Sequence, residues 1–290
     1  MSTPAVEIRD LWFKYSGAAD WTLKNLNLVV NEGEFVVIMG PSGCGKSTLL
    51  YILTGIIPHM IKGEVRGSVY ILGRDILKLP PSEIVKNVGF VFQNPDSQII
   101  MPTVYEEVIF GLENLGLPPE EISRIAREVL EYVDLWNKRD LSPWSLSAGE
   151  RQVLAIASVL ALKPRILILD EPTSMLDHKD TARVLGLISK LKEEFKMTII
   201  VVEHRIEWAV EVADKLVVME NGEFVAQGRP EEVFSRVDVI KRCGIRPPMI
   251  AEVFYYLIER GYQVDRVPVT TRQGLEVLSE MLRSRGVVVE

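Results

Sequence analysis

The chain has 290 residues, of which 47% are hydrophobic, and it carries a formal net charge of −7. The length and the hydrophobic content predict an ordered globular protein with a full core. The negative net charge, together with the lack of any block of Lys or Arg, argues against nucleic acid as a partner. No apolar stretch approaches the roughly 20 residues that cross a bilayer, no export signal is visible, and two cysteines fit a reducing cytoplasm.

The chain begins with two stretches that alternate apolar and polar residues, 6–14 and 26–30, which predict antiparallel strands. Tyr15 follows the first of them. It is a candidate for stacking on an adenine, and a strand-end aromatic that covers the core is the equal alternative. Further along, residues 59–67 are predicted as a loop.

A phosphate loop follows the second strand. Residues 40–48 fit the pattern G-x-x-x-x-G-K-[ST], with a short buried strand before them and a helix after them. The glycines permit backbone angles at which successive N–H groups converge on a phosphate. Lys46 is expected to reach the β- and γ-phosphates and Ser47 to ligate Mg²⁺, while the positive surroundings predict a lowered pKa and a reactive thiol for Cys44, the alternative being an unreactive filler. The expected nucleotide contacts are Gly40, Pro41, Ser42, Gly43, Cys44, Gly45, Lys46, Ser47 and Thr48.

A buried strand at 88–92 ends at Gln93, after which the pattern becomes helical. Residues 94–157 are therefore predicted to form a helical insertion in an otherwise alternating α/β domain. The insertion ends in Leu-Ser-Ala-Gly-Glu at 146–150, where Ser147 is placed to cap the next helix. A helix start of this type also makes an anion site, so both interpretations stay open.

Two acids, Asp170 and Glu171, end a continuous apolar run that predicts a central parallel strand. Beside a phosphate loop, Asp170 is expected to hold the Mg²⁺ shell through water and Glu171 to polarise the attacking water. The alternative is that the acids cap the following helix. The next strand, 198–202, ends before His204, so His204, Asp170 and Gln93 all follow strand ends and can converge on one γ-phosphate.

The last strands, 215–219 and 224–227, flank Asn221-Gly222, a strong hairpin signal. Motifs stop at about residue 237. Residues 237–290 are predicted to form an accessory domain of helix, turn at Gly261, short strand and final helix, with a role in packing or assembly.

The ordered set from Tyr15 to His204 resembles, over residues 5–236, the nucleotide-binding domain of ATP-binding-cassette (ABC) proteins. The resemblance implies an α/β fold: a phosphate-loop NTPase core of the RecA-like type, with an antiparallel β subdomain, a helical subdomain insertion and a small C-terminal α/β extension. It also implies a nucleotide-binding domain over residues 1–236 that binds ATP and Mg²⁺; residues 237–290 then form the C-terminal accessory domain, to which the narrower resemblance to energy-coupling-factor ATPases, described below, gives a role in dimerisation.

The same resemblance implies roles for individual residues. Tyr15 is the adenine-stacking aromatic, Gln93 the loop glutamine that couples the Mg²⁺ and γ-phosphate site to a membrane partner, Glu171 the catalytic carboxylate and His204 the switch histidine. Composite sites imply a head-to-tail dimer with two ATP molecules at its interface. The nucleotide-binding set then also includes Ser147 and Gly149, from the signature that completes the opposite protomer's site, and Asp177.

A narrower resemblance rests on residues 93–98 (Gln-Asn-Pro-Asp-Ser-Gln) and 110–116. These segments look like the ATPase components of energy-coupling-factor importers, which take up vitamins and cobalt or nickel ions. That family implies a peripheral protein on the cytoplasmic face of the cell membrane. Its implied partners are a transmembrane coupling subunit, a substrate-binding membrane subunit, and a second identical or paralogous ATPase, with no nucleic acid.

The signature departs from the usual Leu-Ser-Gly-Gly-Gln at Ala148 and Glu150. Ala148 is tolerable if its φ is negative. Glu150 is expected to add negative charge near a nucleotide, which weakens the site of the opposite protomer or points to a partner with the standard signature. Hydrolysis is still expected, because the phosphate loop and both strand-end acids are intact. The alternatives are a soluble cassette ATPase acting on ribosomes or DNA, and a regulatory nucleotide-binding module without turnover.

Overall fold

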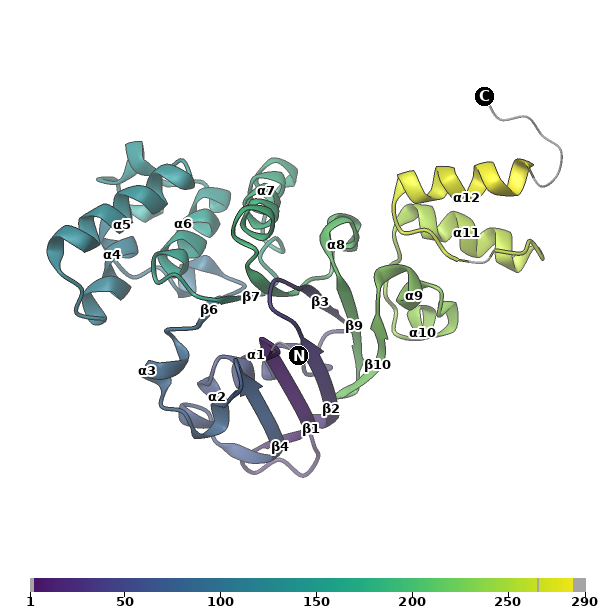
Figure 1. Ribbon diagram of the computed structural model, residues 1–290, viewed down its shortest axis with the longest axis horizontal. Coiled ribbons are helices and arrows are strands. Elements are labelled where there is room, and N and C mark those ends of the chain that lie inside the picture. The colour runs from purple at the N-terminus through teal and green to yellow at the C-terminus, as the bar shows by residue number, and fades with distance from the viewer. Residues whose placement is uncertain (1–2, 265, 284–290) are drawn as a thin grey trace.

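The computed structural model describes residues 3–264 and 266–283. A small antiparallel sheet of order β2-β1-β4-β5 lies below the main sheet in Figure 1. The two strands predicted near the N-terminus are present and pair in antiparallel fashion. The strands of this sheet are β1 (Val6–Tyr15), β2 (Leu23–Val30), β4 (Gly63–Ile71) and β5 (Arg74–Asp75).

Strand β4 corrects the loop predicted for 59–67. It pairs antiparallel with β1 from Gly63 opposite Tyr15 to Ile71 opposite Val6. A Cβ on Gly63 would lie 2.4 Å from the Lys14 carbonyl oxygen, so glycine is needed for the close approach to β1. Because the first half of β4 is polar and glycine-rich, it lacks the alternation that marks a strand.

The main sheet has the order β10-β9-β3-β8-β7-β6, parallel except for β10. Every residue of β3, β7 and β8 is buried, because layers cover both faces of the sheet. The hairpin predicted around Asn221-Gly222 is confirmed as β9 and β10. The strands are β3 (Phe35–Met39), β6 (Val88–Val91), β7 (Ile166–Asp170), β8 (Thr198–Val202), β9 (Lys215–Glu220) and β10 (Glu223–Gly228).

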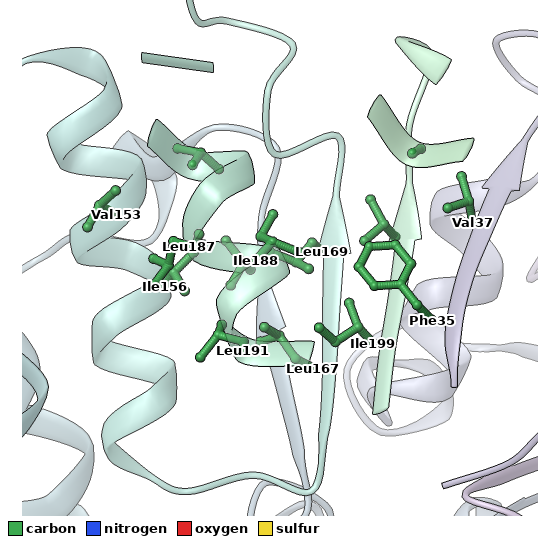
Figure 2. Packing of buried hydrophobic residues seen from close by; sticks show 14 of the residues in the cluster. Phe35, Val37, Val153, Ile156, Leu167, Leu169, Leu187, Ile188, Leu191 and Ile199 are labelled. Atoms are coloured by element: carbon green, nitrogen blue, oxygen red, sulfur yellow. The ribbon is translucent and has the colours of Figure 1, made fainter. Parts of the chain in front are cut away.

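Alternate residues of the central strands face two different hydrophobic clusters. One cluster joins the sheet to helices α6 (Ala148–Ala161) and α7 (His178–Phe195) and is shown in Figure 2; its labelled members include Phe35, Leu167, Leu169 and Ile199. The opposite set, with Val36, Ile38, Ile168 and Ile200, packs with α1 (Lys46–Leu53) and the antiparallel sheet. The strand ends between these layers are thereby held rigidly.

The helical region predicted after Gln93 forms a separate group beside the sheet, drawn in teal in Figure 1. Its last helix, α6, ends at Ala161, four residues beyond the predicted end of the insertion at residue 157. The boundaries of the insertion as a subdomain stay a prediction. The helices up to this point are α1 (Lys46–Leu53), α2 (Ile56–His59), η1 (Ile76–Lys78), α3 (Pro81–Ile84), η2 (Pro95–Ser97), α4 (Val104–Asn114), α5 (Pro119–Tyr132), η3 (Trp136–Lys138), η4 (Pro143–Ser145) and α6 (Ala148–Ala161).

The C-terminal helices lie on the side of the molecule away from that group (Figure 1). Their buried residues belong to the same hydrophobic cluster as the main sheet, and the Tyr255 hydroxyl donates to the Phe234 carbonyl at 2.6 Å. The remaining helices are α7 (His178–Phe195), α8 (Ile206–Val212), α9 (Pro230–Phe234), α10 (Val237–Arg242), α11 (Met249–Glu259) and α12 (Thr271–Arg283).

One C-terminal prediction is wrong. The short strand expected after the turn at Gly261 is absent from residues 262–264 and 266–270. In the second of these stretches, N–H groups bond to side chains instead of to a neighbouring strand: Val267 N–H donates to the Ser235 hydroxyl and Val269 N–H to the Gln273 side chain. Across residues 3–264 and 266–283, no helix combines the length and apolar character needed to span a membrane.

Candidate active site

The phosphate loop connects β3 to α1. It needs glycine for two reasons: the backbone φ angles are positive, and neighbouring atoms leave no space for a Cβ. The backbone φ is +154° at Gly40, +79° at Gly43 and +109° at Gly45. A Cβ on Gly40 would lie 2.0 Å from the Met219 carbonyl oxygen, and one on Gly45 would lie 2.8 Å from a methyl of Leu23. Strands β9 and β2 therefore confine the loop to a conformation that a side chain would forbid.

Lys46 begins α1 and is only 5% exposed. Its Nζ donates to the carbonyl oxygens of Gly40 at 2.8 Å and Pro41 at 3.0 Å, so the ammonium lies over the loop that it is expected to serve. Two residues on, the Thr48 and Tyr15 hydroxyls share a hydrogen bond of 2.8 Å. Tyr15 is thus anchored to the start of α1; its stacking on an adenine stays a prediction.

Cys44 corrects a prediction. Cys44 as a residue is 5% exposed, and burial raises the pKa of its thiol by more than the nearby Lys46 ammonium and the backbone N–H groups of the loop lower it. The positive environment expected from the motif is present, but desolvation of the thiolate is the larger effect. The expected low-pKa thiol is therefore not what this loop contains.

Asp170 ends β7, and only 7% of the residue is exposed. Burial is the largest influence and raises the pKa of Asp170, opposed by a hydrogen bond from the Ser47 hydroxyl and by the charges of Lys46 and His204. A carboxylate beside a hydroxyl is a hard oxygen donor set that suits Mg²⁺, which needs few protein ligands when it shares phosphate oxygens and water. The described residues hold no group of three His, Cys, Asp or Glu side chains able to bind a metal.

Glu171 gathers the other two strand-end side chains. Its Oε2 accepts a hydrogen bond from Gln93 Nε2 at 2.8 Å, and its Oε1 lies 2.9 Å from His204 Nε2. The strands β6, β7 and β8 that carry the three residues are neighbours in the sheet. Glu171 has a φ of +45°, uncommon for a residue with a side chain, and its N–H is held by the Val202 carbonyl oxygen at 2.9 Å.

The structure brings Gln93 and His204 together on Glu171, whereas Asp170 faces the phosphate loop through Ser47. Sequence reasoning assigned no role to two buried residues next to this group, Glu203 and Thr173, whose side chains bond to each other at 2.7 Å. The available signal was a carboxylate between an apolar strand and a candidate histidine.

Ser147, at the start of the signature, is the N-cap of α6, which was one of the two interpretations that the sequence left open. The Ser147 hydroxyl accepts the Glu150 N–H at 3.2 Å, and the Glu150 carboxylate accepts the Ser147 N–H at 3.2 Å. Ala148 is not among the positive-φ residues, so the condition for tolerating its methyl is met. The helix N-terminus is therefore well formed despite both departures from the usual signature.

Gly149 packs directly on helix α7. Its N–H donates to Asp180 Oδ2 at 2.9 Å, and a Cβ would lie 2.3 Å from Asp180 Cγ. Asp177 is the N-cap of α7 and accepts the Asp180 N–H at 2.8 Å. Asp177 is therefore linked to the signature through Asp180, by two hydrogen bonds in series.

The negative charge expected of Glu150 is neutralised within the chain. Its Oε1 lies 2.7 Å from Lys138 Nζ and 3.1 Å from Arg183 Nη1. Burial alone would raise the pKa of Glu150, but hydrogen bonds from Lys138, from the Ser147 backbone and from Arg183 outweigh it and lower the pKa. The carboxylate is therefore paired within the chain, and its effect on a nucleotide in the opposite protomer's site stays a prediction.

The loop after Gln93 is bonded to helix α6. Asp96 Oδ1 accepts from Arg151 Nε at 2.9 Å, and the Gln98 side-chain amide donates to the Ala155 carbonyl at 3.1 Å. The same Gln98 side chain accepts the Phe92 N–H at 3.1 Å. The segment between the strand end and the helical group is thus tied to the signature helix.

Comparison with known proteins gives a consistent result. The family described as "ABC transporter" matches residues 23–174. A putative ABC transporter ATP-binding protein of Pyrococcus horikoshii is 46% identical over 273 residues, covering 94% of this chain and 96% of the relative. One of Pyrococcus abyssi is 48% identical over 256 residues, covering 88% and 91%.

Two solved structures are similar. CbiO1 from Clostridium perfringens, described as part of the ABC transporter complex cbiONQ, aligns with a TM-score of 0.74 at 31% identity, over 88% of this chain and all of that one. The ATP-binding cassette MJ0796, as a dimer in a post-hydrolysis state with ADP and phosphate, aligns with a TM-score of 0.67 at 33% identity, over 77% and 98%. The predicted α/β cassette fold is confirmed.

Proposed function

The chain belongs to the ABC transporter family and is an ATPase, and from this premise we propose that it energises a membrane importer of the energy-coupling-factor type, for a vitamin or a metal ion. The observation that carries the proposal is the likeness to CbiO1 along 88% of this chain. ATP-driven closure of a dimer would push the membrane subunits, and hydrolysis would reset them.

Within the site, each residue has a distinct proposed role. The glycine-shaped loop and Lys46 bind the ATP phosphates, and Ser47 and Asp170, with Gln93, hold Mg²⁺, which when bound neutralises phosphate charge. Glu171 orients and polarises the attacking water. His204 and Gln93 hold Glu171 through their bonds of 2.9 and 2.8 Å and face the γ-phosphate.

The proposed assembly uses the signature and the loop after Gln93. Ser147 and Gly149 complete the ATP site of the opposite protomer, which is identical or a paralogue. The loop that Arg151 ties to α6 receives a transmembrane coupling subunit, so that the chain works as a peripheral protein on the cytoplasmic face of the membrane. Residues 1–236 form the cassette and residues 237–290 assist pairing, while a separate membrane subunit binds the cargo.

The test is affinity purification of the tagged full-length chain from its native membranes, followed by mass spectrometry, with an untagged strain as the control. Recovery of a polytopic transmembrane subunit together with a small substrate-binding membrane protein is the expected result. Recovery of ribosomal or DNA-processing proteins would overturn the importer and favour the soluble alternative. Absence of ATP turnover in the purified complex would favour a regulatory module.

A further inference from the structure

Glu203 joins the two segments that carry Glu171 and His204. It follows β8 and is 1% exposed. Its Oε1 accepts the backbone N–H of His204 at 2.7 Å and that of Arg205 at 3.0 Å. Its Oε2 accepts the hydroxyl of Thr173, a fully buried residue, at 2.7 Å. One carboxylate therefore connects the chain after β8 to the chain after β7.

The chemistry of these contacts suits a carboxylate. An ionised carboxylate only accepts hydrogen bonds, and here donors are directed at both of its oxygens. Such charge-assisted bonds offset the cost of burying the group. Without it, two N–H groups at the start of α8 and a buried hydroxyl would lose their acceptor.

The hydrogen bonds of the Glu203 carboxylate lie beyond the ends of the paired strands, so they are distinct from the hydrogen bonds that hold the sheet together. The pairing of β7 with β8 ends at Asp170 opposite Val202, followed by the bond from Glu171 N–H to the Val202 carbonyl. The Glu203 carboxylate bonds begin directly beyond that point. They constrain the two short segments from which Glu171 and His204 project, whereas the strands are already held by their ladder and by the core.

We propose that Glu203 is a positioning residue for ATP hydrolysis, which acts through His204. By holding the His204 and Arg205 N–H groups and the Thr173 hydroxyl, it fixes the His204 ring so that Nε2 lies 2.9 Å from the Glu171 carboxylate. The inference rests on the proposed roles of Glu171 and His204. It adds a buried residue with no expected ligand contact of its own to the set that determines turnover.

The test compares steady-state ATP hydrolysis by purified full-length variants with their affinity for ATP and their thermal unfolding. Glu203→Gln keeps the size of the side chain but replaces one acceptor oxygen by a donor. Thr173→Val removes the hydroxyl at nearly constant shape, and Thr173→Ser retains it. We expect Glu203→Gln and Thr173→Val to lower kcat about 10-fold, because reacting groups tolerate little misplacement, with the Kd for ATP changed less than about 2-fold. Thr173→Ser should recover most of the rate.

A double-mutant comparison identifies the route of the effect. In a His204→Ala background, Glu203→Gln should lower kcat no further, because both residues act through one group. An equal further loss in that background would overturn the inference, as would a fall in Tm and ATP affinity at unchanged kcat. If Glu203→Gln does not fold, Thr173→Val decides by the same comparison. Full turnover by His204→Ala alone would instead refute the proposed role of His204, and the inference with it.

Discussion

Replacing Glu171 by Gln tests the proposed chemistry with little change in geometry. The amide oxygen can still accept from Gln93 Nε2, and the amide NH₂ can donate to a neutral His204 Nε2, so the contacts now at 2.8 and 2.9 Å are preserved. What is lost is the carboxylate that polarises water. A positioned general base contributes roughly 10²- to 10⁴-fold, so the barrier should rise by about 3–5 kcal/mol.

The assay is single-turnover phosphate release, with ATP affinity measured separately by equilibrium binding. Glu171→Gln should release phosphate at least about 100-fold more slowly than the unchanged chain while its ATP affinity is preserved, and light scattering with Mg-ATP should show an accumulated dimer. Glu223→Gln, an exposed change of the same type on β10, is the matched control and should behave as wild type. Near-normal release by Glu171→Gln would refute the reasoning, because another group would then have to activate the water.

Three further predictions concern the structure around the site. Gly149→Ala places a methyl 2.3 Å from Asp180 Cγ, so the free energy of unfolding in a denaturant titration should fall by about 1–3 kcal/mol and recover in part with Asp180→Ala; unchanged stability would contradict this packing. Glu150→Gln should lower the free energy of unfolding at neutral pH by about 1–2 kcal/mol. The pKa of Glu150 is lower in the folded chain than its ordinary value of 4.5, so its contribution to stability is present above pH 4.5 and is lost as the pH falls through the folded pKa. A stability difference between Glu150→Gln and the unchanged chain that did not depend on pH would contradict this. Cys44 should react with iodoacetamide more slowly in the native than in the denatured chain, as followed by mass spectrometry, because it is buried and its pKa is raised; equal rates would contradict its burial.

The local parts of the site could be predicted from the sequence. The glycine spacing of the phosphate loop, the acids at the end of β7 and the N-cap at Ser147 depend on neighbouring residues, and the structure places them in the expected elements. The strand ends predicted that Gln93, Asp170 and His204 lie at one edge of the sheet, because parallel neighbours end at the same edge, but not that Gln93 and His204 both contact Glu171. Their functional roles stay predictions.

The remaining features depend on contacts that are distant in the sequence. The Glu150 carboxylate meets Arg183 33 positions away, and Glu203 meets Thr173 30 positions away. No spacing pattern in the sequence predicts pairs of residues so far apart. The thiol of Cys44 shows the same limit, since the loop motif predicts the positive charges around it but not the depth of burial that raises its pKa. Strand β4 was missed because its start is shaped by contact with β1 rather than by its own alternation.

The first residues of helix α6 form hydrogen bonds on two sides, to the loop after Gln93 and to helix α7. Arg151 holds Asp96 on the loop side, while Gly149 and Glu150 hold Asp180 and Arg183 on the α7 side. Packed interiors deform little, so these bonds make the start of α6 a rigid connection between the loop after Gln93 and the start of α7. Under the proposed function, a membrane subunit that displaced this loop would therefore shift α6 and the start of α7 together, through bonds in which the phosphate loop takes no part.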